Sequence, residues 1–570
     1  MSYFLKKSNL RKGLYLQIYE SYYDASKKGG RNRSFKAIGY YDDLVAQGIE
    51  DPIAYYKNEV AKMNEAQKAE NENNKFREIT EEPAEKYLGY FPLKNINDAL
   101  GVKRYLDLMQ SVTGLQFNLY SMLSALIYAR VVEPCSKSKT FVDVLPKLFE
   151  ATDFSLNQIY SGLGYMGLEY EKIIEIYNNQ INTIFPFDTS KTYFDCTNFY
   201  FEIDKEDNFR RKGPSKENRK DPIVGLGLLL DAHQIPIGMK LFPGNQSEKP
   251  ELRRVIDDLK DRNCITGRTI HVADKGLNCS ENITHSLLNG DGYIFSKSVK
   301  QLPDVEKEWV LLDQDYIPVK DSLNEVKYYY KECIDDFNYD VIDKNGKKKK
   351  VTLREKRIVT FNPCLAKKQK IEIMRQVDKA TKLNNYSAKK AEYGDSSKYV
   401  NFVAADKKGE AIDGKVITTM NDKKISQDLK LAGFNLLVTS EINMNAQEIY
   451  DTYHNLWRIE ESFKVMKTQL DAQPVYLQKE ETITGHFLIC YLSVLLERIL
   501  QFKILENKYS TETLFEFFRQ YKVARVADRK YANLSKLTPF MKDFTEITNL
   551  PLRGYFLNNT QIKKMLSHRF

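Results

Sequence analysis

Three acidic residues stand where they could act together on one substrate. Asp195 lies within a strand-like segment, TYFDCTNFYFEI (192–203), and Asp274 comes near the end of another, RTIHVADKG (268–276). Ligand sites in open α/β sheets favour the carboxyl ends of strands, so Asp274 is well placed for a functional role. Glu460 lies on a long amphipathic helix near the other end of the chain.

Each acid also has a structural interpretation. Asp195 could be a hydrogen-bonded aspartate among aromatic residues, and Asp274 could be a turn residue or an N-cap. Glu460 could be a surface carboxylate paired with Lys464 one helical turn away. Two strand acids and one helix acid together are more specific than any one alone, and they favour a shared site.

Such a trio suits phosphodiester chemistry. Hard divalent ions such as Mg²⁺ prefer carboxylate oxygens and keep several waters, which leaves coordination positions for a phosphate. Two ions about 4 Å apart can activate an attacking water or hydroxyl and stabilise the leaving 3′ oxygen. Softer ions favour histidine or cysteine ligands, and the six histidines form no HxxxH-like pair.

The helix carrying Glu460 is predicted from about Ala446 to Leu470. Tyr453, Glu460 and Lys467 are spaced by seven residues. At about 100° per residue, they fall on one stripe within about 20° of each other per step. This stripe would combine a hydroxyl, a carboxylate and an ammonium.

Residues 191–300 must position the two strand acids. After the first strand, 222–231 and 235–244 predict a hairpin of apolar strands, and 292–299 predicts a last strand. Three antiparallel strands, a helix, a strand, a helix and a strand are the order of ribonuclease-H-like folds. We therefore expect an α/β protein with a ribonuclease-H-like mixed-sheet core.

The remaining segments are arranged around this core. We expect a small β-hairpin plus helix module, a helical region that is either a DNA-reading bundle or a scaffold, and a core interrupted by a large β-rich insertion. The expected boundaries are 1–85 for the module, 86–190 for the helical region, 191–300 for the first part of the core, 301–444 for the insertion, 445–480 for the catalytic helix and 481–570 for a C-terminal helical region.

Composition excludes several protein classes. The chain has 570 residues, of which 42% are apolar and 29% charged, so a mainly disordered or fibrous chain is not expected. The N-terminus lacks the apolar stretch of a signal peptide, and the longest apolar run, Phe487–Leu496, is shorter than the roughly 20 residues that span a bilayer. Seven scattered cysteines contain no CxxC pair. We expect a soluble cytoplasmic protein without a membrane partner.

Positive charge is concentrated in two segments. The net charge is +9, and residues 205–220 and 344–357 hold seven and eight basic residues. Such clusters suit phosphate backbones, although solvated loops look the same. The candidate DNA-binding residues there are Arg210, Arg211, Lys212, Lys347, Lys348, Lys349 and Lys350.

Three segments resemble the catalytic blocks of DDE transposases from bacterial insertion sequences. YFDCTNFYFE, HVADKGL and YHNLWRIEESFKVMK carry the three acids, and the similarity is greatest to insertion-sequence family four and its relatives. Their helix signature is Tyr-x2-Arg-x3-Glu-x6-Lys. Tyr453, Glu460 and Lys467 match it, but Leu456 stands at the Arg position, and Arg458 cannot occupy the same helical azimuth.

The resemblance implies a DNA transposase. Asp195, Asp274 and Glu460 would bind two Mg²⁺ or Mn²⁺ ions, water would nick the element end, and the freed 3′-OH would attack target DNA. Tyr453 and Lys467 would hold phosphates, with Lys275 and Arg458 as further DNA contacts. The partners would be element ends and target DNA, bound by a homodimer. In relatives a flipped base stacks on a tryptophan of the insertion; either Trp309 or Trp457 could do so here, but we expect core packing for both.

Two other functions are compatible with these residues. One is a structure-selective nuclease on the same fold that cleaves without strand transfer. The other is a domesticated DNA-binding protein without activity, which the intact acids argue against.

Overall fold

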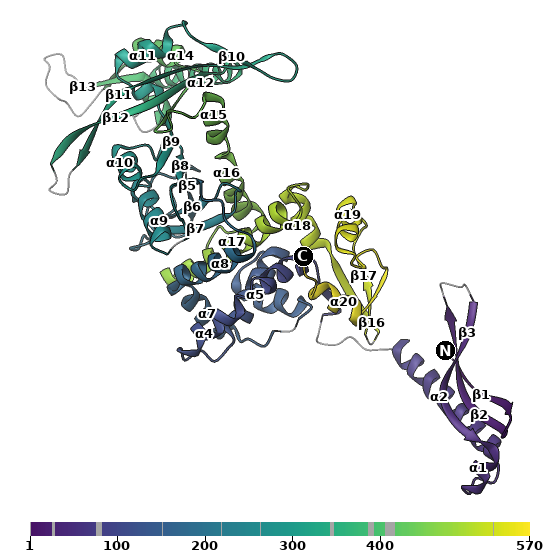
Figure 1. Cartoon of the computed structure of the whole chain (residues 1–570). Helices are drawn as coiled ribbons and strands as arrows, with labels where there is room; N and C mark the ends of the chain where they lie inside the picture. The colour runs from purple at the N-terminus through teal and green to yellow at the C-terminus, as the bar shows by residue number, and fades with distance from the viewer. Residues whose placement is uncertain are drawn as a thin grey trace. The chain divides into compact units, whose positions relative to one another are not determined.

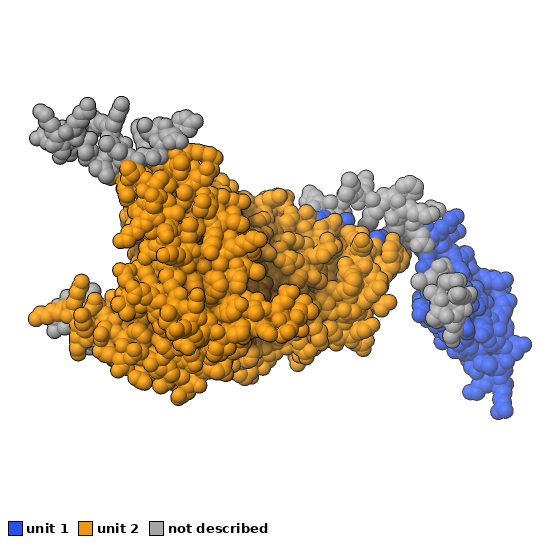
Figure 2. Space-filling model, turned by 90° about the horizontal axis from the view of Figure 1, so that it is seen from above, with its two compact units in different colours: residues 1–84, 525–531 blue, residues 85–524, 532–570 orange. Residues whose placement is uncertain are grey.

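The computed structural model divides the chain into two compact units. The first is Met1–Ala84 with Arg525–Tyr531, and the second is Glu85–Ala524 with Ala532–Phe570; Figure 2 draws them in blue and orange. The structure describes residues 2–24, 29–75, 83–150, 152–217, 219–262, 264–342, 347–385, 393–404, 416–527 and 529–570.

The first unit is an antiparallel sheet of order β1-β2-β3 with helices α1 and α2. The sequence indicated the hairpin of β2 and β3, but β1 was not anticipated; it pairs with β2 along its whole length. Helix α2 follows Asp51, whose carboxylate accepts hydrogen bonds from the amides of Ile53 and Ala54. The bounds are β1 Ser2–Leu10, β2 Gly13–Asp24, β3 Gly29–Tyr40, α1 Tyr41–Ala46 and α2 Pro52–Lys75.

The second unit is built on a large mixed sheet of order β10-β11-β12-β15-β9-β8-β5-β6-β7. Within it β5, β6 and β7 form an antiparallel meander, while β8 runs parallel to β5 and β9 runs parallel to β8. The mixed α/β class expected from the sequence is confirmed. These strands are β5 Lys191–Tyr200, β6 Ile223–Leu230, β7 Pro236–Pro243, β8 Ile270–Ala273 and β9 Gly292–Lys297.

The segment predicted as a β-rich insertion extends this same sheet. β12 pairs with β15, which pairs with β9, so the free edge of β9 is covered and its backbone groups are hydrogen-bonded. A separate small sheet of β13 and β14 lies beside the long helix α12. The bounds are α11 Asp304–Leu311, β10 Ile317–Lys320, β11 Val326–Ile342, β12 Lys348–Phe361, α12 Pro363–Asn385, β13 Val400–Ala404, β14 Val416–Met420, α14 Asp422–Lys430 and β15 Phe434–Thr439.

Different helices cover the two faces of the central strands. Helices α9 and α10 pack on one face over a continuous apolar core that includes Phe194, Cys196 and Ala273. Helix α15 packs against β8 and β9, and α16 packs against β5, on the side away from α9 and α10 (Figure 1). The bounds are α9 Lys249–Asp261, α10 Ser280–Leu288, α15 Ala446–His454 and α16 Trp457–Lys464, followed by a π-helical turn η5 at Val465–Gln469.

Helices before and after the sheet pack together around α17. Its apolar run Phe487–Leu496 is buried, as predicted. Among the described residues, Glu480–Ile504 is the helical stretch long and apolar enough to cross a membrane, and its apolar window is entirely buried in the protein. The bounds are α3 Phe91–Ala99, α4 Lys103–Ser111, α5 Leu119–Val132, α6 Lys137–Lys139, η1 Thr140–Val144, η2 Leu145–Lys147, α7 Leu156–Leu168, α8 Tyr170–Ile184, α17 Glu480–Arg498 and η6 Ile499–Ile504.

The sequence had indicated a helical C-terminal region, but the structure also has three strands there. These strands join the short β4 in a sheet of order β18-β17-β16-β4. In it β16 pairs antiparallel with β4, so the C-terminal region is hydrogen-bonded to Glu85–Tyr87. Edge pairing over so few residues carries too weak a pattern to be read locally. The bounds are β4 Glu85–Tyr87, α18 Thr511–Gln520, β16 Lys522–Ala527, β17 Lys530–Asn533, α19 Pro539–Thr548, β18 Phe556–Asn558 and α20 Asn559–Leu566.

Candidate active site

Alternation along β5 decides where Asp195 points. Its neighbours Phe194 and Cys196 are buried in the apolar core beneath α9 and α10. Successive side chains of a strand point to opposite faces, so Asp195 lies on the face that α15 and α16 cover. Its side chain is 20% exposed, so a ligand can reach a carboxylate that is otherwise shielded from water.

The parallel pairing of β5 and β8 brings Asp274 to the same place. Ala273 at the end of β8 lies opposite Phe194, so Asp274 follows in register with Asp195. The hydroxyl of Tyr453 donates a hydrogen bond to Asp274 Oδ1 at 2.7 Å. Burial, and then the Asp274 carboxylate, raise the pKa of Tyr453 far above its usual value, so the phenol keeps its proton and remains a donor.

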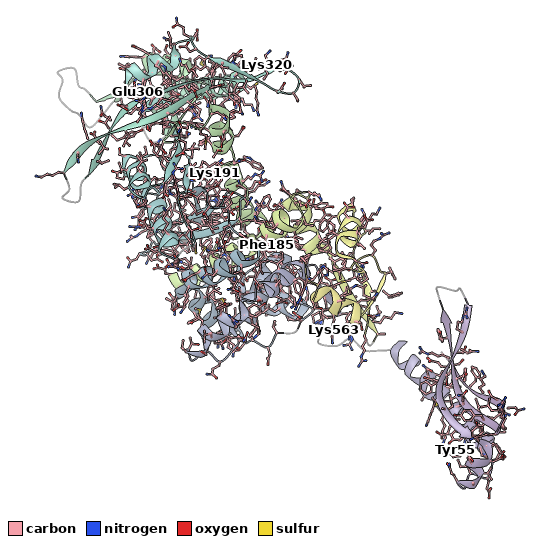
Figure 3. All side chains as sticks on the ribbon, in the orientation of Figure 1. Tyr55, Phe185, Lys191, Glu306, Lys320 and Lys563 are labelled. Carbon is pink, nitrogen blue, oxygen red and sulfur yellow. The ribbon has the colours of Figure 1, made fainter. Side chains whose placement is uncertain are left out.

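Contacts at the start of β5 fix α15 in this position. Lys191, labelled in Figure 3, donates a hydrogen bond to Thr452 Oγ1 at 3.2 Å and forms an ion pair with Glu448 at 3.6 Å. At the N-terminus of the helix, the side chain of Asn445 accepts a hydrogen bond from the Glu448 amide and caps α15. These contacts hold Tyr453 against the strand ends.

A lysine lies among the carboxylates. Lys216 Nζ is 3.8 Å from Asp195 Oδ1 and 3.6 Å from Glu248 Oε1, and it also donates a hydrogen bond to the Cys196 carbonyl. Burial raises the pKa of Asp195 to about 6; the Lys216 ammonium opposes this shift, and the carboxylates of Glu248 and Asp274 add to it. We call Asp195, Asp274 and Glu248 the acidic cluster.

The predicted continuous helix is interrupted, which corrects the stripe of Tyr453, Glu460 and Lys467. Around Leu456 the backbone forms tight i to i−3 hydrogen bonds between α15 and α16, and the π-helical turn η5 widens the last turn. The three residues therefore lie on three successive segments with different windings. The geometry of one continuous ideal helix therefore no longer describes their relative directions.

Glu460 forms no hydrogen bond or ion pair with the other two acids. Its side chain is exposed in the first turn of α16 and makes no hydrogen bond or ion pair with any described residue. In the part of the chain that the structure describes, no three acidic, histidine or cysteine side chains gather closely enough to hold a metal ion. The structure thus places Asp195 and Asp274 in register, and Glu460 forms no hydrogen bond or ion pair with either of them.

Lys467 reaches the β5–β6 loop. Its Nζ forms an ion pair with Glu217 Oε1 at 2.7 Å and lies 5.4 Å from the centre of the Phe199 ring. Gln473 also donates a hydrogen bond to Glu217, at 3.1 Å. Glu217 is therefore the ion-pair partner of Lys467, whose ammonium the resemblance assigns to a phosphate.

Residues around the missing signature arginine pack against one another. Leu456 is buried, and the Arg458 guanidinium lies over the rings of Trp457 and Phe502 at 5.3 and 5.6 Å. Trp309 packs against the main core as expected, but the expected core packing of Trp457 is wrong, because its side chain is 50% exposed.

The basic candidates differ in their availability. Arg210 pairs with Asp207 at 2.6 Å and donates to the Leu477 carbonyl, and Arg211 lies 4.0 Å from Glu206. Part of the first basic segment thus binds its own acids. The exposed candidates are Lys212, Lys275, Lys347 and, on β12, Lys348, Lys349 and Lys350.

Three members of the site were not identified from the sequence. Lys216 and Glu217 lie inside the basic segment that we noted, but charge counting could not show that this loop folds back over β5. Glu248, one residue before α9, carried no signal in the sequence. The close approach of the segments around Lys216 and Glu248 depends on the β5–β6–β7 meander.

The donor chemistry of Asp195 and Asp274 fits a hard divalent cation. Carboxylate oxygens are the ligands such ions prefer, and the ammonium of Lys216 already stands beside Asp195 as a positive charge. Asp195 and Asp274 would hold the ion. Lys216 would have to withdraw from Asp195 to admit it.

Comparison with known proteins agrees with this chemistry. No curated protein sequence matches the chain. The family model of the transposase DDE domain matches residues 194–496, which is more than half of the chain and contains all three predicted acids. The family acts on DNA and generally uses divalent metal ions. The chain belongs to the DDE transposase family.

Proposed function

We propose that this chain is a DNA transposase that cleaves the ends of its own element and joins the 3′-OH ends to target DNA. The observation that carries the proposal is the registered pair of Asp195 and Asp274 on one face of the sheet, inside the matched domain. The strand order β7-β6-β5-β8-β9 supports a ribonuclease-H-like core, with β10 to β12 and β15 added at one edge.

Two Mg²⁺ or Mn²⁺ ions, when bound, would supply Lewis acidity at the scissile phosphate. Asp195 and Asp274 provide the first carboxylates, and Tyr453 orients Asp274 through its hydrogen bond. Glu460 would complete the set when α16 and DNA come together. Since α16 already packs against β5, a local change in the winding at Leu456 suffices to redirect the Glu460 side chain.

DNA would replace the internal partners of two cations. Lys216 leaves Asp195, and Lys467 exchanges Glu217 for a phosphate. In the first reaction water attacks phosphorus and a 3′-OH is released. In the second that 3′-OH attacks a target phosphate, and the target strand's own 3′ oxygen leaves. One phosphodiester bond is exchanged for another, so no external energy source is needed.

The direct test combines the full chain with Mg²⁺, oligonucleotides of the element end and a supercoiled target. The proposal predicts nicking of the end and joining of a pre-cut end to the target. Asp274→Asn and Glu460→Gln should abolish both reactions while DNA binding remains. Nicking without any joining would favour the structure-selective nuclease, and binding without either reaction would favour the inactive DNA-binding protein.

We propose a homodimer as the working state, because two element ends must be processed together. Sedimentation velocity with end DNA should show two chains per pair of ends. A single chain bound to both ends would contradict it.

A further inference from the structure

A pocket in the second unit is lined by buried arginine, lysine and histidine side chains. It has a volume of about 480 Å³ and lies between the end of α5, the start of α6, residues 471–477 and α17. We call it the basic pocket. Its lining includes Arg130, Lys137, His486, Tyr160 and Tyr476, and one acid, Asp471.

Two cationic side chains in this pocket are buried without an ion pair to any described carboxylate. Arg130 and Lys137 are only 5% and 6% exposed. Arg130 donates a hydrogen bond to the Leu470 carbonyl at 3.3 Å, and Lys137 Nζ lies 3.4 Å from His486 Nδ1. Among the described residues, no carboxylate forms an ion pair with either of them.

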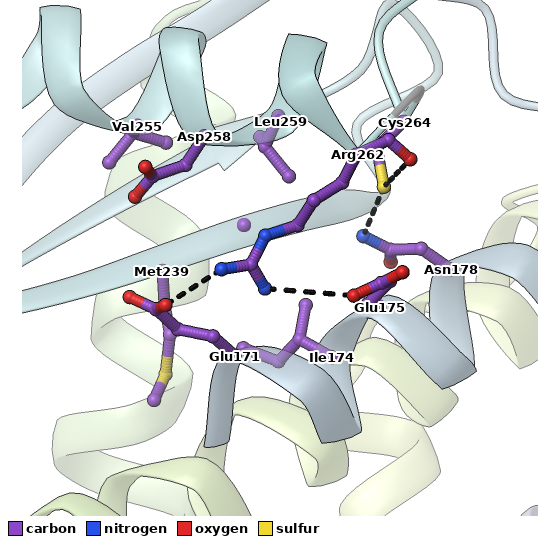
Figure 4. A pocket seen from close by; sticks show the side chains of 11 residues that line it. Glu171, Ile174, Glu175, Asn178, Met239, Val255, Asp258, Leu259, Arg262 and Cys264 are labelled. Atoms are coloured by element: carbon purple, nitrogen blue, oxygen red, sulfur yellow. Dashed lines mark hydrogen bonds and ion pairs between the residues drawn. The ribbon is translucent and has the colours of Figure 1, made fainter. Parts of the chain in front are cut away.

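A partly buried cation elsewhere in the chain is paired with acids. In a small cavity between α8, α9 and β7, Arg262 forms ion pairs with Glu171 at 2.7 Å and Glu175 at 4.0 Å (Figure 4). Buried charges are normally paired in this way. In the basic pocket, by contrast, Asp471 lines the wall, but no carboxylate of the described residues is paired with either buried cation.

This arrangement is unfavourable without a ligand. Burial, and then the Arg130 guanidinium, lower the pKa of Lys137 well below its usual range. Burial, then Lys137 and Arg130, also lower the pKa of His486, so its imidazole is neutral. An anion between Arg130 and Lys137 would reverse the effect on Lys137 and offset the repulsion.

The surroundings point to a phosphate on a strand. Ser136 and Ser138 supply hydroxyl donors in the pocket wall. The pocket shares Tyr160 and Tyr476 with a neighbouring groove of about 660 Å³, and the Tyr476 side chain is 69% exposed. A buried cationic end and an open aromatic groove are the combination that binds single strands.

The basic pocket is also connected to Lys467 and to the loop that carries Glu217. Gln473 lines the pocket and donates to Glu217, the partner of Lys467. Arg130 holds the carbonyl of Leu470, just after the π-helical turn that carries Lys467. A strand that leaves the cleavage site past Lys467 would therefore meet this pocket.

We propose that the basic pocket binds one phosphate group through Arg130 and Lys137, and that a DNA strand supplies it. The chemistry of the site requires only a phosphate. Its assignment to DNA rests on the proposed transposase function.

The first test measures thermal unfolding of the full chain in inorganic phosphate, without divalent metal, against chloride at equal ionic strength. Phosphate at about 100 times its Kd should raise the melting temperature by a few degrees, because it binds the folded chain alone. Lys137→Met, which keeps the volume, should weaken phosphate affinity at least about tenfold. In chloride this variant should melt above the wild type, because it removes an uncompensated buried amine.

The matched control is Lys260→Met, since Lys260 is paired with buried Asp291 at 2.5 Å. It should keep the phosphate response and melt below the wild type in chloride. Lys137→Gln provides a second variant if methionine disturbs folding. An unchanged phosphate response in both Lys137 variants would overturn the site.

The second test identifies the source of the phosphate with a labelled single-stranded oligonucleotide, again without metal. Inorganic phosphate should weaken its binding to the wild type but not to Lys137→Met. Equal DNA affinity in wild type and variant, with phosphate binding lost, would overturn the assignment to DNA. Because neither test needs cleavage, an inactive wild type would refute the proposed function and leave this site standing, and an active enzyme with an unresponsive pocket would do the reverse.

Discussion

The acidic cluster and the basic pocket treat buried charge in opposite ways. In the acidic cluster, Lys216 lies among Asp195 and Glu248, and Tyr453 donates to Asp274. In the basic pocket, Arg130 donates a hydrogen bond to a carbonyl and Lys137 lies beside an imidazole. The Arg130 guanidinium also repels the Lys137 ammonium. The first site has an internal cation beside its carboxylates, whereas in the second no described carboxylate is paired with the two buried cations, although Asp471 lines the pocket. The difference indicates that a metal ion must displace Lys216 from Asp195, whereas a phosphate can bind Arg130 and Lys137 without displacing an ion-pair partner.

The largest expected effect concerns cleavage. Asp195→Asn, Asp274→Asn and Glu460→Gln should each lower the cleavage rate with Mg²⁺ by at least about 10³-fold, because each removes an oxygen donor for a metal ion. Single-turnover cleavage of end DNA measures the loss. Glu461→Gln is the matched control, because its carboxylate neighbours Glu460 in sequence but lies about 100° around the helix. Full activity of Glu460→Gln would show that the acidic cluster works without it.

The second effect tests whether the acidic cluster carries more negative charge than Lys216 compensates. Because the folded-state pKa of Asp195 is raised to about 6, the folded protein binds its proton more tightly than the unfolded chain, whose aspartate titrates near 4. The unfolding free energy should fall as pH rises from about 4 to 6 and then level off. Asp195→Asn should remove this fall and gain about 3 kcal/mol above pH 6 without metal, measured by denaturant unfolding.

Glu460→Gln is the control for this measurement, since the exposed Glu460 has no partner among the described residues. Its unfolding free energy should stay within about 0.5 kcal/mol of the wild type at every pH. A stabilisation by Asp195→Asn that persists unchanged at pH 4 would contradict the electrostatic explanation.

A smaller effect concerns the internal donor of the acidic cluster. Tyr453→Phe should lower the unfolding free energy by about 1.5 kcal/mol, because it removes a hydrogen bond to a charged acceptor. Tyr450→Phe is matched on the same helix, where its ring stacks on Tyr328 and should be unaffected. Equal stability of both variants would show that Asp274 does not depend on Tyr453.

The smallest effect concerns the loop that couples the two regions. Glu217→Gln removes the partner of Lys467 in a partly exposed ion pair, so stability should change by less than about 1 kcal/mol. Affinity for end DNA should rise about two- to fivefold, because Lys467 no longer needs to exchange partners. Filter binding at low salt measures this. A fall in affinity would mean that Glu217 positions Lys467 for DNA.

The sequence predicted the central part of the fold because its signals are local. Alternation around Asp195 and the apolar run of β6 reflect strand geometry and burial, so the order of β5 to β9 followed from the pattern. The directions in which side chains point from the predicted long helix were less predictable. The tight turn at Leu456 depends on how α15 and α16 each pack on the sheet, and the seven-residue spacing that linked Tyr453 to Glu460 is identical with or without it.

Sequence alone determined which residues could do chemistry: two strand acids, a helix acid and a lysine, in blocks typical of one family. Tertiary structure decided which of them meet. It placed Asp195 beside Asp274 through the parallel register, brought Lys216 from a loop, left Glu460 exposed and buried Arg130 and Lys137 without a counter-ion. The physical reason is range: strand alternation and helix periodicity act over a few residues, whereas the partner of a charge is chosen by segments that fold together from distant parts of the chain.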